Sequence, residues 1–335
     1  MNLRIRSQGL LTTVQDGGRL GFLDQGMPPS GALDRESLAL ANALVGNDPG
    51  QAVLEIIGFG PSLEVEAESA RIAMAGNLRA VLDGKPLACW RSHRLVRGQV
   101  LELGAVQETR TAYLAVAGGF ALPAVMGSRS TYLRAGLGTR LEAGGLLPLV
   151  LPMAPETGEL HLPHPPRLAG KLLRVIAGPE ADRFTPGSLS QFFETVWRVS
   201  QESDRMGIRL DGAKLNHLQA ADIAPVGLVQ GCIQVPGDGR PILLLADHQT
   251  TGGYARIATV ISADLPAAGR LAPGSDIHFS RVTWQEARAA LVENRRALTD
   301  LLQRIRPLEG LDQEALMAAN LVSGAVSALE EEDEP

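Results

Sequence analysis

The chain has 335 residues, of which 45% are hydrophobic and 20% are charged, and its formal net charge at pH 7 is −6. This length exceeds a single typical hydrophobic core and predicts two lobes, while the acidic balance argues against a protein that binds the phosphate backbone of nucleic acids. Its two cysteines, Cys89 and Cys232, lie far apart without a CxxC spacing, which argues against a disulfide scaffold and a structural zinc site.

The ends and the hydropathy of the chain predict a soluble protein of the cytoplasm. The residues Met1–Ser7 lack the apolar segment of a signal peptide, and no segment approaches the apolar length of a membrane span. We therefore expect neither a membrane nor a nucleic acid as a partner. The 37 glycines and 21 prolines indicate many turns, and hence many strands.

In chain order, the first predicted elements are an edge strand over Leu3–Leu11 and a helix over Asp34–Val45. Asp34 is placed to cap this helix and Gly46 to end it. From residue 52 to about 149, short apolar stretches are separated by Gly, Pro, Asn and Asp. Their even spacing predicts an antiparallel barrel or sandwich. The clearest of them are Val53–Ile57, Arg71–Ala75, Val100–Leu103 and Thr111–Ala117.

A proline-dense segment at 152–170 predicts a stiff connection between a first lobe, residues 1–151, and a second lobe, residues 171–283. The second lobe is predicted to contain a helix around 189–196 and strands around 228–235, 241–246, 256–263 and 276–282. Thr283-Trp-Gln-Glu286 has the form of a capping box and predicts a helix to about Ile305. A further helix over about 312–329 completes the helical region 284–329, and residues 330–335 are predicted to be a solvated acidic tail.

The most informative stretch is Ala246-Asp-His-Gln-Thr-Thr-Gly-Gly-Tyr254, which follows the apolar strand predicted over Pro241–Leu245. Polar side chains are costly to bury unless they are paired, so their concentration at the end of a strand predicts a binding or reacting edge. Gly252 and Gly253 allow the backbone to approach a bound group closely. Alternation along the strand places Asp247 and Gln249 on one side and His248 on the other, and we favour Asp247 over His248 for the chemistry.

Three other polar clusters each have a functional and an ordinary interpretation. Gly127-Ser-Arg-Ser-Thr131 suits an anionic oxygen, or is a hydroxyl-rich turn with an exposed arginine. Ser203-Asp-Arg-Met-Gly207 carries an acid beside a base, or is a local ion pair at a turn. The helix entry Pro28–Asp34 offers first-turn amides to an anion, or is capped by Ser30 or Asp34.

Several motifs are missing from the sequence. The histidines have no HxH, HExxH or HxxxH spacing, so no metal site is expected. There is no GxxxxGK[ST] phosphate loop, no GxGxxG unit, no GxSxG elbow and no Met-Lys-Met biotin attachment site. We therefore expect that this chain neither hydrolyses ATP through a phosphate loop nor carries covalent biotin.

Taken together, these segments resemble the family of the 5-oxoprolinase C subunit, also known as the KipA family, the allophanate hydrolase subunit 2 family or the carboxyltransferase domain of urea carboxylase. The resemblance rests on blocks that occur in order between about residues 10 and 280. They are Thr13-Val-Gln-Asp-Gly-Gly-Arg19, Gly26-Met-Pro-Pro-Ser-Gly-Ala-Leu-Asp34, Ala41-Asn-Ala-Leu-Val-Gly-Asn47, Ala52-Val-Leu-Glu55, Gly127-Ser-Arg-Ser-Thr-Tyr-Leu133, Ser203-Asp-Arg-Met-Gly-Ile-Arg-Leu210, Gly231-Cys-Ile-Gln-Val-Pro236 and Ala246–Tyr254.

The resemblance implies a mainly β protein with a few helices, built as two cyclophilin-like β-barrel lobes that face each other across a cleft. It also implies that the blocks at 26–34, 127–132, 203–209 and 247–254 converge on that cleft. The expected partners are a KipI-like subunit and a LamB/YcsF-like subunit. Together with this chain, these subunits would use ATP, with Mg²⁺, to open 5-oxoproline to glutamate.

Two positions depart from the family pattern. The glycine-rich loop that usually follows the Arg-Ser-Thr block is abbreviated here to Ala135–Gly145, with Gly145 where an Asp is expected. If this loop closes over a substrate, its shorter length affects substrate choice or activity. His248 also occupies a position that varies within the family.

The leading hypothesis is thus a subunit of an ATP-dependent 5-oxoprolinase. Asp247 is expected to be the general base or acid, and Gln249 and Tyr254 to orient the lactam. The expected anion- and substrate-binding residues are Ser30, Asp34, Arg129, Ser130, Thr131, Tyr132, Asp204, Arg205, Thr250, Thr251 and Gly252. The alternatives are a biotin-dependent carboxyltransferase acting on urea or a related amide, and a non-catalytic regulatory protein that binds a KipI-like partner.

Overall fold

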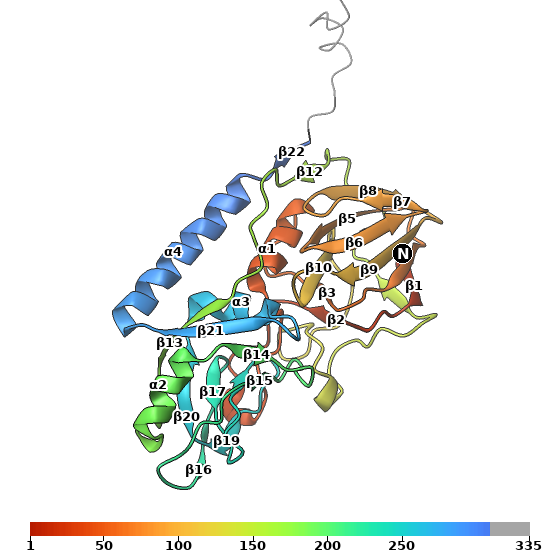
Figure 1. Cartoon of the computed structure of the whole chain (residues 1–335). Helices are drawn as coiled ribbons and strands as arrows, with labels where there is room; N and C mark the ends of the chain where they lie inside the picture. The colour runs from red at the N-terminus through yellow and green to blue at the C-terminus, as the bar shows by residue number, and fades with distance from the viewer. Residues whose placement is uncertain (309–335) are drawn as a thin grey trace, which may run out of the picture.

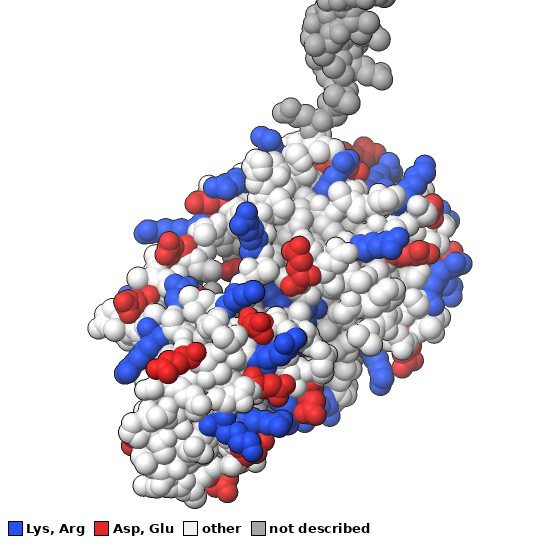
Figure 2. All heavy atoms as spheres, in the orientation of Figure 1, with Lys and Arg blue, Asp and Glu red and all other residues white. Residues whose placement is uncertain are grey.

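The computed structural model describes residues 1–308, and it confirms a mainly β protein of two lobes with a few helices (Figure 1). The predicted helix at 312–329 and the acidic tail at 330–335 lie outside the described residues. No helix in the described part of the chain is both long enough and apolar enough to cross a membrane. On the face drawn in Figure 2, acidic and basic side chains are intermixed, and neither sign forms a continuous stripe.

The first lobe consists of two antiparallel sheets packed face to face. The six-stranded sheet has the order β11-β1-β4-β9-β6-β7, and the five-stranded sheet has the order β2-β3-β10-β5-β8. The strands are β1 (Asn2–Ser7), β2 (Leu11–Gln15), β3 (Val53–Ile57), β4 (Ser62–Val65), β5 (Ser69–Ala75), β6 (Leu78–Leu82), β7 (Lys85–Leu87), β8 (Ser92–Val96), β9 (Val100–Val106), β10 (Thr111–Val116) and β11 (Leu146–Pro148). The spacing of these strands predicted an antiparallel barrel or a sandwich, and the structure shows the sandwich.

Strand β10 explains why this lobe has two hydrophobic layers. All six of its residues are buried, because alternate side chains point to opposite faces of the sheet. Ala112, Leu114 and Val116 pack between the two sheets. Tyr113 and Ala115 pack on the other side, against the apolar face of α1 (Arg35–Leu44). The helix begins after Asp34, whose carboxylate accepts hydrogen bonds from the amides of residues 36 and 37, as the capping prediction requires.

The second lobe is a closed barrel with the strand order β13-β20-β17-β18-β15-β14-β21. Its core is rich in aromatic and aliphatic side chains, among which Phe192 stacks on Phe279 with ring centroids 4.7 Å apart. The elements are β13 (Leu172–Ala177), α2 (Pro186–Glu194), β14 (Trp197–Val199), β15 (Gly207–Asp211), β17 (Cys232–Gln234), β18 (Ile242–Leu244), β20 (Arg256–Val260), α3 (Leu265–Arg270) and β21 (Asp276–Arg281), with the hairpin β16 (Asp222–Gly227) and β19 (Thr251–Tyr254) beside the barrel.

The predicted elements of this lobe are found with small shifts. Helix α2 begins earlier than predicted because Thr185 caps it and Pro186 occupies its first turn, where a missing amide costs nothing. The short helix α3 and strand β16 had no clear periodic pattern and were not predicted. Short 3₁₀ turns occur at Leu23–Gln25, Leu133–Ala135, Ala181–Arg183 and Ser262–Asp264 (η4).

A long helix and a two-residue ladder connect the lobes on one side. The predicted capping box at Thr283 is present, and α4 runs from Trp284 to Gln303, two residues short of the predicted end. The chain after α4 forms β22 (Arg306–Pro307), which pairs with β12 (Leu160–His161) from the proline-dense segment. Helix α4 contacts both α1 of the first lobe and η4 of the second (Figure 1).

The lobes also join directly through the loop that precedes α1. The Ser30 amide donates to the Ala246 carbonyl at 3.0 Å, and the Arg110 amide donates to the Arg270 carbonyl at 2.8 Å. Leu33 belongs to the hydrophobic core of the second lobe. A β-carbon on Gly269 would lie 2.3 Å from the Leu33 carbonyl oxygen, so only glycine permits this approach. The two family blocks at 26–34 and 246–254 therefore meet.

Candidate functional site

The polar stretch 246–254 begins where β18 ends, at the junction of the two lobes. Asp247 and His248 are buried there, whereas Gln249 and Thr250 are partly buried and Tyr254 is 40% exposed. The predicted site residues consequently divide between a buried junction and an open groove, and each place has its own chemistry.

Arg205 is the centre of the buried junction. Its Nε donates to Asp247 Oδ2 at 2.9 Å, and its Nη2 donates to Asp247 Oδ1 at 3.2 Å and to the Gly31 carbonyl at 2.7 Å. Its Nη1 donates to the Glu55 carboxylate. Burial by itself would lower the pKa of Arg205, but the charges of Glu55 and Asp247 raise it above its ordinary value.

Arg205 was expected to hold an anion of the substrate, and this role stays a prediction. Every nitrogen of its guanidinium already donates to a group of the protein, and the side chain is 5% exposed. Arg205 therefore fixes Asp247 within the second lobe and connects it to Glu55 and Gly31 of the first lobe. Glu55 is fixed in turn, since its Oε2 accepts from the Tyr113 hydroxyl and from the Leu33 amide, both at 2.8 Å.

A second buried carboxylate, Asp16, organises the hydroxyl-rich loop. Its Oδ1 accepts from the Ser128 and Ser130 hydroxyls at 2.7 and 2.6 Å and from the Gly18 amide at 2.8 Å. Its Oδ2 accepts from the Arg129 amide at 2.6 Å. Burial would raise the pKa of Asp16, but these hydrogen bonds lower it below its ordinary value.

The loop at 127–131 therefore serves Asp16, and its role in binding an anion of a ligand stays a prediction. The hydroxyl of Ser130 and the amide of Arg129 are directed at this carboxylate. The Thr131 hydroxyl donates to the Thr139 carbonyl at 3.0 Å, and Arg129 Nε donates to the Leu122 carbonyl at 2.8 Å. Local sequence could not reveal this arrangement, because the acceptor lies more than a hundred residues earlier.

Asp34 is likewise not placed to bind a substrate. Its carboxylate caps α1, accepts from the Ser37 hydroxyl at 2.6 Å and pairs with Arg270 at 2.9 Å. The ordinary interpretation of this position, helix capping, is the one that the structure supports.

Several buried polar atoms at the lobe interface meet no hydrogen-bond partner within the described residues, and three of them lie on the segments around residues 19, 30 and 248. They are Ser30 Oγ, His248 Nε2 and Arg19 Nη1, in side chains that are at most 1% exposed. Such an atom costs about 1–3 kcal/mol if nothing binds it, so it is a candidate contact for a water or a ligand. The backbone brings their segments together, because Arg19 donates to the Pro29 carbonyl at 2.6 Å and Ser30 donates to Ala246.

His248 has the chemistry of a proton acceptor. Its Nδ1 lies 2.7 Å from the Gln249 carbonyl, which can only accept, so Nδ1 carries the proton and Nε2 presents a free lone pair. Burial lowers the pKa of His248 and keeps the ring neutral, although the Asp247 charge opposes this shift. The preference for Asp247 over His248 therefore weakens, because both Asp247 oxygens already accept from Arg205.

Arg19 was missed as a candidate, although its block was recognised. Its Nε and Nη2 donate to the carbonyls of Val125 and Ser130, which leaves Nη1 free. Burial lowers the pKa of Arg19, while the charges of Asp16 and Asp247 act in the opposite direction. In the sequence, the signal that could have identified Arg19 is an arginine placed directly after the Gly17-Gly18 turn.

The open groove begins at Gln249 and is lined by three of the remaining predicted residues. It has a volume of about 290 Å³, and its walls include Asp204, Gln249 and Tyr254 from the second lobe and Arg134 from the first. Gln249 Nε2 donates to Gln234 Oε1 at 3.1 Å, and Arg134 lies 4.0 Å from Asp204. The groove is therefore polar and bridges the two lobes.

The other predicted residues lie around this groove or beside the junction. The hydroxyls of Thr250 and Thr251 make no hydrogen bond within the described residues, so they are available to a ligand. Burial and the Asp247 charge raise the pKa of Tyr132, which places its hydroxyl in the field of that carboxylate. A β-carbon on Gly252 would lie 2.6 Å from a Leu228 methyl group and 2.7 Å from Gln234 Nε2.

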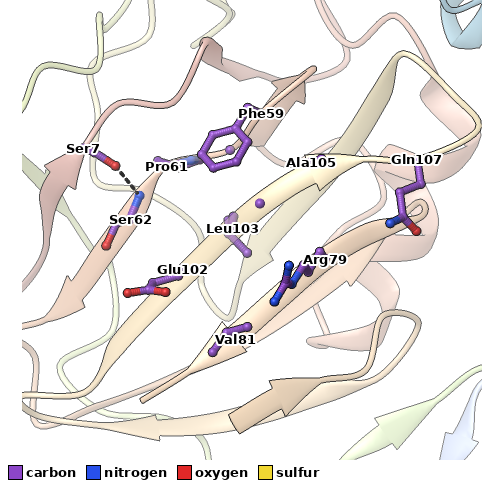
Figure 3. Close-up of a pocket in the computed structure, with 12 residues that line it drawn as sticks. Ser7, Phe59, Pro61, Ser62, Arg79, Val81, Glu102, Leu103, Ala105 and Gln107 are labelled. Atoms are coloured by element: carbon purple, nitrogen blue, oxygen red, sulfur yellow. Dashed lines mark hydrogen bonds between the residues drawn. The ribbon is translucent and has the colours of Figure 1, made fainter. Parts of the chain in front are cut away.

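A larger hollow lies elsewhere. It has a volume of about 600 Å³ and follows the outer face of the six-stranded sheet (Figure 3). Figure 3 shows Phe59 and Leu103 beside Arg79 and Glu102 there, and none of the predicted site residues lines it. Within residues 1–308, no group of three or more His, Cys, Asp or Glu side chains is arranged to hold a metal ion.

We expect the Asp16 carboxylate to contribute strongly to stability. Replacing it by Asn (Asp16→Asn) should lower the free energy of unfolding at neutral pH by about 2 kcal/mol, because charge-assisted hydrogen bonds are lost. Since the pKa of Asp16 is lowered in the fold, its contribution is present above its unfolded value of about 4 and is lost as the pH falls further. Urea unfolding between neutral and acidic pH should therefore show the two proteins converging in acid. A constant difference would contradict this.

Residues 25–281 match the family model described as carboxyltransferase domain, subdomain A and B. The chain is 38% identical to the C subunit of 5-oxoprolinase from Escherichia coli (strain K12) over 309 residues, a match that covers 90% of this chain and 98% of that protein. It is 33% identical to the corresponding 5-oxoprolinase C subunit of Haemophilus influenzae over 305 residues, with 88% and 95% covered.

Among solved structures, the crystal structure of the Kluyveromyces lactis urea amidolyase is similar, with a TM-score of 0.82 and 28% identity. The match covers 93% of this chain and 20% of the amidolyase chain. This chain thus spans about a fifth of that much larger protein, and nearly the full length of the bacterial relatives.

Proposed function

This chain belongs to the carboxyltransferase-domain family that contains the C subunit of 5-oxoprolinase, and we propose that it plays the part of that subunit in an ATP-dependent enzyme complex. In this role it binds 5-oxoproline at the lobe junction while the complex opens the lactam to L-glutamate. The proposal draws on a relative that this chain matches over 98% of its length.

The observation that carries the proposal is a pair of unpartnered buried atoms on segments that meet at the lobe junction. His248 Nε2 accepts a hydrogen bond and Ser30 Oγ donates or accepts one, and both meet no partner within the described residues. They lie on the two segments that the Ser30–Ala246 hydrogen bond joins. A small lactam has one N–H donor, one carbonyl acceptor and a carboxylate, so it can satisfy such groups.

The chemistry follows from these positions. Opening the lactam requires water to add to the amide carbon and the C–N bond to break, with a proton delivered to the leaving nitrogen. His248 Nε2 takes the proton from water and returns it, since its neutral ring is matched to that task. Asp247, held by Arg205, supplies a fixed negative charge, and Arg19 Nη1 with the Thr250 and Thr251 hydroxyls binds the substrate carboxylate.

ATP enters the proposal at the level of the complex. With Mg²⁺ it would supply phosphoryl transfer to the amide oxygen and leave as ADP. After water has added and the C–N bond has broken, a second water would release inorganic phosphate from the resulting acyl phosphate and give glutamate. We assign ATP binding to the other subunits, because this chain has no phosphate loop. The proposed partners are a KipI-like subunit and a LamB/YcsF-like subunit.

Reconstitution tests this function. Purified chain, mixed with the KipI-like and LamB/YcsF-like subunits, should release glutamate and ADP from 5-oxoproline and ATP, and each omission should abolish release. The control replaces ATP with a non-hydrolysable analogue. A stable complex with the KipI-like subunit that releases no glutamate would leave only the regulatory binding role.

A second function, carboxyl transfer to urea or a related amide, is favoured by the structural likeness to urea amidolyase. This chain has no biotin attachment sequence, so a partner would have to carry carboxybiotin. Incubating the chain with a carboxybiotin donor and urea distinguishes between the two proposed functions. Carboxylated urea without 5-oxoproline turnover would favour the second.

We expect Gly252→Ala to alter substrate binding more than stability. Its new methyl group would displace the Gln234 amide, and with it the hydrogen bond that orients Gln249. Because only flexible side-chain ends must move, the free energy of unfolding should change by about 1 kcal/mol or less. We expect KM for 5-oxoproline to rise about tenfold, the effect of one neutral hydrogen bond. Gly253→Ala is the matched control, since a β-carbon there approaches only the Ile223 carbonyl, at 3.3 Å.

A further inference from the structure

A second cavity lies where three helices meet, on the side of the molecule that α4 covers (Figure 1). It has a volume of about 390 Å³ and is bounded by the start of α1, by η4 and the start of α3, and by the middle of α4. We call it the helix-junction cavity. None of the proposed catalytic residues and none of the groove residues lines it.

The floor of the helix-junction cavity is apolar. Leu33 comes from the first lobe, Leu265 and Pro266 from α3, and Leu291 and Leu298 from α4. Small-molecule sites in proteins are concave, mostly apolar and typically 300–1,000 Å³ in volume, with a few polar groups that fix the orientation of the ligand. Both the size and the lining of this cavity meet that description.

The rim carries positive charge that the protein does not neutralise. Arg35 and Arg295 line the cavity, and neither makes an ion pair or a side-chain hydrogen bond within the described residues. Glu36 is the acid that lines it, and both of its oxygens are occupied. One accepts from Arg270 at 2.9 Å and the other from Asn294 at 2.6 Å.

The charges around Arg35 agree with a rim that lacks a contacting acid. Burial lowers the pKa of its guanidinium, and the only opposing influence is the more distant charge of Asp16, which four hydrogen bonds already stabilise. Arg35 is exposed in the fold, and because no carboxylate pairs with it within the described residues, its guanidinium can pair with an incoming anion.

We propose that the helix-junction cavity binds a small amphiphilic carboxylate, whose apolar body rests on the leucine floor while its carboxylate pairs with Arg295 and Arg35. Gln230 and Ser262 lie at the same rim and offer neutral hydrogen bonds. Because its walls come from both lobes and α4, an occupant stabilises their packing. This site is separate from the proposed lactam site and does not depend on it.

The test uses phenylacetate as the probe, with phenylacetamide as a neutral compound of the same shape and acetate as a head group without a body. Titration calorimetry on the full chain should show saturable binding of phenylacetate. Phenylacetamide and acetate should each bind about tenfold more weakly or worse, because a charge-assisted pair or the apolar contact is missing.

Two variants locate the site. Arg295→Gln keeps the helix propensity of α4 and should weaken phenylacetate binding about tenfold or more. Leu291→Trp should abolish it by filling the cavity. Arg296→Gln, one position along on the exposed surface, is the matched control and should bind as the parent does. Thermal unfolding without ligand confirms that each variant is folded.

The proposal is overturned if phenylacetate does not bind saturably, or if phenylacetamide binds equally well. It is also overturned if Arg295→Gln binds like the parent, or if Arg296→Gln weakens binding as much as Arg295→Gln, since that would indicate general attraction to a basic helix.

Discussion

Replacing Arg205 by methionine (Arg205→Met) should lower the free energy of unfolding by about 3–5 kcal/mol, because the change leaves Glu55 and Asp247 buried without their counter-charge. Methionine keeps most of the volume of the side chain, so the loss reports charge and hydrogen bonds more than packing. Chemical denaturation at neutral pH gives the value directly.

Two further variants make this result decisive. Arg209→Met removes an arginine that is exposed and 3.8 Å from Glu202, so it should change the free energy of unfolding by no more than about 0.5 kcal/mol. If Arg205→Met fails to fold, Arg205→Lys retains the charge but cannot donate to Asp247, Glu55 and Gly31 together, and it should be intermediate. Equal stability of Arg205→Met and Arg209→Met would show that the buried ion pairs do not hold the lobes.

Replacing His248 by glutamine (His248→Gln) should reduce turnover of 5-oxoproline by the reconstituted complex about 10²–10⁴-fold, the usual contribution of a general base. Glutamine can still hydrogen-bond but cannot take a proton. KM and the free energy of unfolding should change little. His93→Gln is the control, because that ring contacts the Ala88 carbonyl in the first lobe, away from the junction.

The pH profile gives an independent measurement of this role. Burial lowers the pKa of His248, so the base form persists below the ordinary histidine value of about 6.5. As the pH falls through this lowered pKa, the ring is protonated and kcat/KM should decline with a slope of one proton. His248→Gln should lack that limb. Retained turnover within about twofold of the parent would reject His248 as the base, and Asp247→Asn would then test the original assignment.

These expectations weigh Asp247 and His248 differently from the sequence alone. The sequence favoured Asp247 because strand alternation places it on one side with Gln249, and because His248 occupies a position that varies within the family. In the fold both Asp247 oxygens accept from Arg205, which lies forty-two residues earlier in the chain, whereas His248 Nε2 has no partner within the described residues. A side chain is available for chemistry only if its neighbours leave it free, and those neighbours are distant in sequence.

The hydroxyl-rich block at 127–131 also shows that local sequence does not reveal which partner a polar group binds. Its composition is suited to an anion, and it does bind one, but that anion is Asp16 of the same chain. The block at 13–19 and the block at 127–131 were both recognised as family signatures. Their pairing explains why they occur together, because each satisfies the buried polar groups of the other.

The sequence by itself determined the classes of structure: strand-rich lobes from short, evenly spaced apolar stretches, capped helices at 35–44 and 284–303, and the family from its ordered blocks. These features depend on local periodicity, capping and turn chemistry, which neighbouring residues specify. Tertiary structure alone decided which polar groups are used internally and which remain free for a ligand. That choice depends on contacts between residues tens to hundreds of positions apart, so Arg205, Asp16 and Asp34 became parts of the framework while His248, Ser30 and Arg19 became the candidates.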